Sequence, residues 1–222
     1  MGIPLTTEEY VKRHKADLQA LGFDIQFLAF VFFLLDIKGG DVIKYETEDD
    51  FVVLCSDGTK WLIQVKNSVD DYAKMTDADF DFWKTFDNWL TLYAISISKA
   101  DFLKDGNRFI LYTNKTLSNS FYEQIKGLKQ GKYGIEEVIS FLQKVKETVS
   151  YFPIVEKMLK LGKVELRMFL LKVEVMQLPD SLGALYEKFL IQYNRPTKAE
   201  QIVCELLGKL HTEKINAATT VQ

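Results

Sequence analysis

The chain has 222 residues, of which 47% are hydrophobic and 27% are charged, and its formal net charge is −3 at pH 7. This is ordinary globular composition, and the negative charge excludes a global basic field, so any nucleic-acid binding needs a local basic patch. The longest apolar run, residues 27–37, is too short to cross a bilayer and ends at Lys38. The N-terminal residues lack the layout of a signal peptide. We therefore expect a cytoplasmic protein with no membrane partner.

The first part of the chain predicts two helices and three strands. Residues 6–9, Thr-Thr-Glu-Glu, form a capping pattern that opens an amphipathic helix reaching about residue 20, and Gly22 is expected to end it. A second helix over 23–37 is apolar nearly all round, which is typical of a central helix. Three runs of β-forming residues follow, at 41–46, 50–55 and 60–66.

The rest of the chain predicts one more strand of the core and then mainly helices. Acidic residues at 77–81 suit the start of a helix over 82–98, and residues 108–114 predict a fourth strand. Beyond these, we expect helices at about 118–130, 135–149 and 152–161, a strand within 168–178, and two closing helices capped by Asp180 or Ser181 and by Thr197. The order predicts an α/β fold: one domain over 1–222, with a core at about 20–115 and a helical extension at about 116–222.

Residues 48–68, EDDFVVLCSDGTKWLIQVKNS, predict a β-hairpin with two possible registers. A two-residue type I′ turn at Asp57-Gly58 pairs residues whose numbers add up to 115 and sets Asp49 opposite Lys66. A three-residue loop with Gly58 in a bulge pairs residues adding up to 114, which sets Asp50 opposite Gln64 and Glu48 opposite Lys66. Both turns fit the dipeptide, and we choose Asp50 as the main acidic residue through the bulged turn.

These strand ends carry the residues of a metal-dependent phosphodiesterase. A carboxylate at one strand end, with oxygen donors from the next strand, can hold Mg²⁺. The metal lowers the pKa of a bound water and stabilises charge on a scissile phosphate. We expect Asp50 to be the main ligand, the Gln64 side chain and the Val65 backbone carbonyl to be auxiliary ligands, and Lys66 to be the catalytic cation. Mn²⁺ is expected to substitute for Mg²⁺.

This pattern resembles the Asp…(Glu/Gln)-X-Lys motif of the PD-(D/E)XK nuclease superfamily. With GFDIQ, YETEDDFVV, LIQVKNS, DFWKTFDNW and ILYTN, in order and spacing, residues 20–115 resemble the double-stranded-DNA endonuclease domain of the CBASS (CD-NTase-associated) effector nucleases. Related domains begin some large bacterial antiviral NTPases. The resemblance implies a restriction-endonuclease-like core (helix, three-stranded meander, helix, strand) and Mg²⁺-dependent cleavage of double-stranded DNA with low sequence specificity, in antiphage defence.

The same resemblance implies partners for this chain. One site cuts one strand, so double-strand cleavage predicts a homo-oligomer. We expect the chain to be the N-terminal part of a longer protein whose C-terminal part is a sensor or NTPase domain.

Further residues are expected to support the site. Many superfamily members have Glu where this chain has Gln64, so one negative charge is missing. We expect lower metal affinity, with a contribution from Glu46 or Glu48, and Asp49 is a further supporting residue. Gln26 falls where the family that this chain resembles has Gly-X-X-X-Gln, here Gly22 to Gln26. We expect Gln26 either to donate a hydrogen bond at the active-site end of the sheet or simply to cap or bridge backbone groups. Three residues are candidates for contacting DNA phosphates: Lys84, Asn114 and Lys115.

Three other interpretations compete with this one. The first is a catalytically inactive nuclease-fold module that binds DNA or a protein partner. The second keeps the chemistry but acts on RNA or on single strands. In the third, Lys66 forms an ordinary cross-strand ion pair with Asp50 or Glu48, and the chain is an adaptor.

Overall fold

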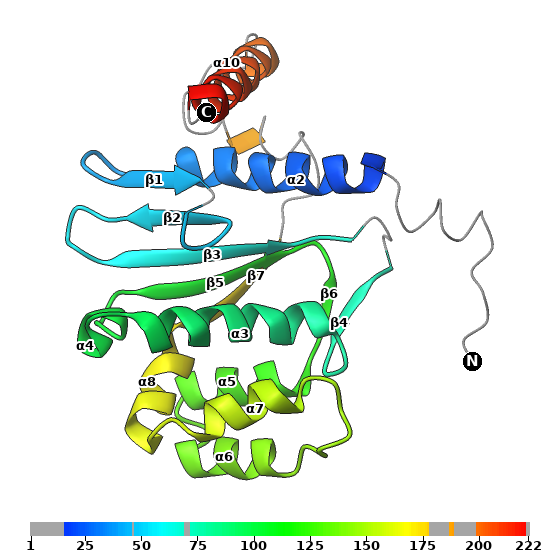
Figure 1. The fold of residues 1–222 in the computed structure, drawn as a ribbon, viewed down its shortest axis with the longest axis vertical. Helices are drawn as coiled ribbons and strands as arrows, with labels where there is room; N and C mark the ends of the chain where they lie inside the picture. The colour runs from blue at the N-terminus through cyan, green and yellow to red at the C-terminus, as the bar shows by residue number, and fades with distance from the viewer. Residues whose placement is uncertain (1–15, 46, 69–71, 178–186, 189–198, 221–222) are drawn as a thin grey trace. The chain divides into compact units, whose positions relative to one another are not determined.

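The computed structural model describes residues 16–45, 47–68, 72–177, 187–188 and 199–220 (Figure 1). The chain divides into two compact units, residues 1–36 with 179–222, and residues 37–178. This division does not coincide with the boundary that we expected near residue 115, and the single nuclease domain stays a prediction. None of the helices in the described part of the chain is long and apolar enough to span a membrane.

The first unit contains two long helices, α2 (Ala16–Leu34) and α10 (Ala199–Thr220). Val31, Leu35 and Val203 form its buried apolar cluster. The prediction that Gly22 ends a helix is wrong, because α2 runs through it: a single glycine costs a helix only about 1 kcal/mol, which the packing of a mostly apolar helix offsets. The expected caps, and the first ten residues of the expected opening helix, lie outside the described residues.

The second unit is built on a five-stranded sheet in the order β1-β2-β3-β5-β7 (Figure 1). The first two pairings are antiparallel and the last two are parallel. The unit is therefore α/β, as predicted. Its strands are β1 (Val42–Tyr45), β2 (Phe51–Leu54), β3 (Lys60–Lys66), β5 (Arg108–Thr113) and β7 (Val173–Gln177).

The β2–β3 hairpin adopts the bulged register. Its paired residues run from Phe51 with Ile63 to Leu54 with Lys60, so their numbers add up to 114. The N–H of Gly58 donates to the carbonyl of Cys55 at 2.9 Å, and Gly58 has φ +77°, a left-handed conformation that favours glycine. The choice of Asp50 over Asp49 rested on this register, which is confirmed.

Helix α3 (Phe80–Ile95) follows β3 and lies against the sheet. Asp79 caps it by accepting a hydrogen bond from the N–H of Asp81 at 2.9 Å. The ring of Trp89 packs against Phe109 of β5, with 5.7 Å between centroids. Three short elements nearby were not predicted: β4 (Lys74–Thr76) pairs in parallel with β6 (Thr116–Ser118) in a second sheet, and α4 (Lys99–Phe102) precedes β5.

The four remaining helices of this unit are α5 (Ser120–Lys129), α6 (Ile135–Gln143), α7 (Phe152–Leu159) and α8 (Lys163–Lys172). The strand predicted within 168–178 is confirmed as Val173–Gln177, and α8 takes the residues before it, 168–172. One apolar core joins these helices and α3 to the sheet, through Leu62 among others. Since side chains alternate along a strand, Gln64 and Lys66 lie on the same face of β3 as Leu62. Both candidate residues are therefore on the helix-covered face.

Candidate active site

Asp50 is attached to the strand beside it by a backbone hydrogen bond. Residues 47–50 bend between β1 and β2, and pairing with β3 begins only at Phe51. From this bend the Oδ2 atom of Asp50 accepts the backbone N–H of Val65 at 2.6 Å. Its Oδ1 atom makes no hydrogen bond to any residue that the structure describes. Asp50 thus has one carboxylate oxygen fixed to β3 and the other without a hydrogen bond to the described residues.

Gln64 is buried, with 4% of its surface exposed, and is held by α3. Its Oε1 atom accepts a hydrogen bond from Nδ2 of Asn88 at 2.8 Å. The sequence analysis did not single out Asn88. The signal that could have found it is its place in DFWKTFDNW, residues 81–89, one of the segments that carry the family resemblance.

Asp49 is held by the neighbouring residue of the same helix. Its Oδ2 atom accepts the indole N–H of Trp89 at 2.7 Å, and its Oδ1 atom accepts the backbone N–H of Asp50 at 3.1 Å. Burial raises the pKa of Asp49 to about 7, helped by the charge of Asp50 and opposed by the two hydrogen bonds and by the charge of Lys66. Asp49 is thus a carboxyl group that titrates near neutral pH.

Lys66 has no such partner. It lies half-buried at the end of β3, two residues beyond Gln64. Its charge lowers the pKa of Asp49, so the ammonium group is within electrostatic reach of that carboxyl. Within the part of the chain that the structure describes, the Lys66 ammonium makes no hydrogen bond and no ion pair. Its ammonium is therefore available to a ligand.

An open hollow of about 480 Å³ lies between residues 47–50 and α3. Four of the side chains that line it are acidic and one is basic, so the hollow attracts cations rather than phosphates. It is lined by Thr47, Glu48, Asp49, Asp50, Gln64, Lys84, Asp87, Asn88, Thr91 and Leu92.

Glu48 does not lie opposite Lys66, so that prediction is wrong. The bend at 47–50 ends the pairing of the two strands, and the carboxylate of Glu48 forms an ion pair with Lys60 instead, at 2.8 Å. Glu46 lies outside the described residues. Gln26 belongs to α2 in the other compact unit, and its predicted bond to the sheet stays a prediction.

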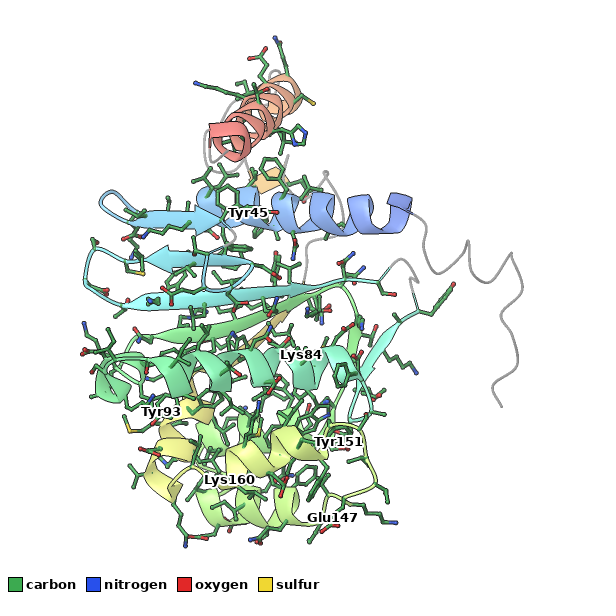
Figure 2. All side chains as sticks on the ribbon, in the orientation of Figure 1. Tyr45, Lys84, Tyr93, Glu147, Tyr151 and Lys160 are labelled. Atoms are coloured by element: carbon green, nitrogen blue, oxygen red, sulfur yellow. The ribbon has the colours of Figure 1, made fainter. Side chains whose placement is uncertain are left out.

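The three candidate DNA contacts are engaged within the protein. Lys84 on α3 (Figure 2) forms an ion pair with Asp87 at 2.9 Å. Asn114 binds the backbone of Ser68 twice, accepting its N–H at 2.8 Å and donating to its carbonyl at 2.7 Å. Lys84 lines the same hollow as Asp50 and Gln64, whereas Asn114 is not among the residues that line it.

Lys115 is buried and forms ion pairs with Asp79 and Asp81, both at 2.8 Å. Burial alone would lower the pKa of Lys115, but the two carboxylates outweigh it and raise the pKa. A role in binding a phosphate has no support from this arrangement.

The donor atoms at the site are of the chemical type that binds a hard cation. The carboxyl groups of Asp49 and Asp50, the amide oxygen of Gln64 and the Val65 carbonyl are oxygen donors, which Mg²⁺ prefers. Within the described ranges, no group of three or more His, Cys, Asp and Glu side chains is placed to hold a metal. The site therefore combines two carboxylates with neutral oxygens, and the negative charge missing at Gln64 predicts weak affinity.

No protein-family model and no curated protein sequence matches this chain. A solved structure described as the Moraxella osloensis Cap4 SAVED/CARF-domain containing receptor is similar to it, with a TM-score of 0.54 and 17% sequence identity. The similarity covers 85% of this chain and 42% of the receptor chain, so this chain spans less than half the length of that receptor. At this identity, the likeness shows a shared fold.

Proposed function

We propose that the protein is a Mg²⁺-dependent endonuclease with a restriction-endonuclease-like core that hydrolyses double-stranded DNA with little sequence specificity. One observation carries the proposal: Asp50 is fixed to the backbone of β3 beside Gln64, and Lys66, on the same face as Gln64 and two residues further on, has no bonded partner among the residues that the structure describes. This is the arrangement that the Asp…Gln-X-Lys pattern requires.

The residues divide the chemistry between them. Asp50, the Gln64 amide and the Val65 carbonyl would hold the metal, with the carboxyl of Asp49 beside them. When bound, Mg²⁺ supplies a Lewis acid that lowers the pKa of a water and offsets the charge of the phosphate. The ammonium of Lys66 donates hydrogen bonds to the attacking water or to a phosphate oxygen, and its charge stabilises the transition state.

The acidic hollow also bears on how DNA is bound. Four acids line it, so a phosphate enters only when cations offset their charge. We therefore expect DNA binding to require the metal and to involve more than one copy of the chain. The sequence resemblance and the fold shared with a Cap4 receptor support a role in antiphage defence, within a longer protein that carries a sensor or NTPase domain.

The first test is cleavage of a supercoiled plasmid in Mg²⁺, in Mn²⁺ and in EDTA. We expect Asp50→Asn and Lys66→Ala to lose cleavage by about 100-fold or more, since each removes charge that acts on the transition state. Matched controls change the same residue types elsewhere: Asp105→Asn and Lys44→Ala, both exposed, should cut like the wild-type protein. Metal-dependent cutting that survives in both site variants would overturn the proposal.

A second candidate function is an inactive module of the same fold that binds a protein partner. The observation that favours it is that the oxygen of Gln64 is already bonded to Asn88, in a hollow that repels DNA. This candidate predicts no cutting at any protein concentration, and no metal-dependent binding of a plasmid.

A further inference from the structure

One aspartate of α3 binds two lysines from different helices. The Oδ2 atom of Asp87 accepts a hydrogen bond from the Lys84 ammonium at 2.9 Å, and its Oδ1 atom accepts one from the ammonium of Lys157 on α7, which packs against α3 (Figure 1). Burial would raise the pKa of Asp87, but the hydrogen bonds from the two lysines outweigh it and lower the pKa. Asp87 is therefore ionised at neutral pH, and the three side chains together carry one surplus positive charge.

Both lysines keep hydrogen-bond donors for a ligand. Each ammonium has three N–H groups, and within the part of the chain that the structure describes each uses one of them, on Asp87. The exposed fraction of the side chain is 48% for Lys84 and 51% for Lys157, whereas that of Asp87 is only 17%. The positive groups therefore face solvent, and the carboxylate that joins them is largely covered.

The charges around the hollow are sorted between its two walls. Its acids other than Asp87 lie on the bend at 47–50, whereas Lys84 and Asp87 lie on α3. Lys157 does not line the hollow itself, but it is bound to the α3 wall through Asp87. The wall formed by the bend is therefore negative and suits a cation, and the wall formed by α3 has a positive surplus and suits phosphate oxygens.

We propose that Lys84 and Lys157 bind the phosphate backbone of a DNA duplex beside the metal site, and that Asp87 fixes the spacing of their ammonium groups. The inference rests on the proposed function, because it takes DNA as the ligand. It goes beyond that function by assigning a contact with DNA to α7, which lies outside the part of the chain that carries the sequence resemblance. Since the net charge of the chain is −3, such a contact has to be local.

The sign of the effects of three substitutions tests the proposal. The readout is the affinity for a fluorescein-labelled DNA duplex, by fluorescence anisotropy at saturating Mg²⁺, with Lys66→Ala in every protein so that the duplex stays uncut. We expect Lys84→Gln and Lys157→Gln each to weaken binding by about three- to tenfold at low salt, and to reduce the slope of log affinity against log salt by about 1. Asp87→Asn removes the negative charge and keeps both lysines, so it should tighten binding by about threefold.

Lys163→Gln is the matched control. Lys163 on α8 is also an exposed lysine that forms an ion pair with another helix, through Glu136 of α6, but neither residue lines the hollow. Its loss should change the affinity for the duplex by less than about twofold. If the ion pairs of Asp87 only hold α7 to α3, Asp87→Asn breaks both pairs and should weaken binding at least as much as Lys157→Gln. Melting curves show that each variant is folded.

The outcomes separate this inference from the proposed function. Equal affinities for Lys157→Gln and Lys163→Gln, or weaker binding by Asp87→Asn, would overturn the inference, and metal-dependent cutting by the wild-type protein would still stand. The expected order of affinities, in a protein whose wild-type form cuts no plasmid, would support the DNA surface and overturn the endonuclease. A protein that binds no duplex at saturating Mg²⁺ would overturn both.

Discussion

Two trios, each of two aspartates and one lysine, lie along α3, one at the start of the helix and the other near Trp89. Asp79, Asp81 and Lys115 form one of them, at the start of the helix, and in it the lysine is bonded to both carboxylates at 2.8 Å. Asp49, Asp50 and Lys66 form the other. There, neutral N–H groups hold the carboxylates, and the lysine is bonded to neither.

The difference separates a structural cluster from a candidate site. In the first trio, the charges satisfy one another, and nothing is left to act on a ligand. In the second, donors without charge fix the carboxyl groups in place, and the charges of Asp50, of Lys66 and, once it is ionised, of Asp49 are left for a ligand to complete. Such incompletely matched, partly buried charge is a mark of functional sites.

Replacing either lysine alone with methionine should give the largest difference between the trios, in cleavage rate and in stability. We expect Lys66→Met to reduce plasmid cleavage by about 100-fold while changing the free energy of unfolding by less than about 1 kcal/mol. Lys115→Met should do the reverse and cost about 3 kcal/mol, because it leaves two carboxylates without their cation. Urea unfolding and cleavage rates of both variants check this. If Lys66→Met proves the more destabilising change, the comparison fails.

The stability that the two trios contribute should also depend on pH, in the acidic range for Asp49 and in the alkaline range for Lys115. The pKa of Asp49 rises from 3.8 to about 7 on folding, so the folded state holds the proton more tightly and loses stability as pH rises from about 4 to about 7. The effect is at most about 4 kcal/mol. The raised pKa of Lys115 gives stability that is fully present below its ordinary value of 10.5 and is lost above it.

Asp49→Ala isolates the pH dependence of stability that comes from Asp49. In EDTA, the stability advantage of the wild-type protein over Asp49→Ala should shrink between pH 4.5 and 8. A constant difference would show that Asp49 does not titrate in this range.

Two tryptophan variants test how strongly the uncharged N–H donor of Trp89 binds the Asp49 carboxyl. Trp89→Phe removes the N–H that binds the Asp49 carboxyl, whereas Trp83→Phe removes one that binds the carbonyl of Asp77 at the same distance, 2.7 Å. Hydrogen bonds to an ionised group are stronger, so Trp89→Phe should cost about 1 kcal/mol more at pH 8 than at pH 5. The cost of Trp83→Phe should be the same at both pH values, as measured by urea unfolding.

The smallest effect concerns the turn that sets the register. Gly58→Ala places a side chain at φ +77° and should cost about 1 kcal/mol, whereas Gly39→Ala, with no atom within 4 Å of its added carbon, should cost less than about 0.5. Melting curves check both values. Because Asp50 is also bound to Val65, cleavage by Gly58→Ala should persist below its melting temperature.

The sequence predicted best what depends on short-range patterns. Strand-forming residues around a Ser-Asp-Gly turn determine β2, β3 and their two possible registers, and the acids before α3 locate its start. Within residues 168–178 the sequence predicted the strand but not where it starts, because a short apolar run fits a buried helix as well as a strand, and the end of α8 takes residues 168–172.

The candidate site was predicted in part for a related reason. Asp50, Gln64 and Lys66 are linked by one hairpin, so their placement follows from a local register. Asn88 and Trp89 come from a helix more than twenty residues further on, and only tertiary packing brings them to Gln64 and Asp49. The ion pairs of Lys84 and Lys115 were not predicted, because a sequence does not reveal which lysines have carboxylate partners, and the contacts of both residues with DNA stay a prediction.

The bond between Asp50 and the N–H of Val65 has a consequence for how the site withstands change over evolution. The group that fixes the carboxylate belongs to the main chain, so it is present whichever of nineteen amino acids occupies position 65. Drift at that position can alter packing, yet it leaves the anchor of Asp50 in place. Only proline, which has no N–H, would release the carboxylate, and proline is also excluded there by the strand itself.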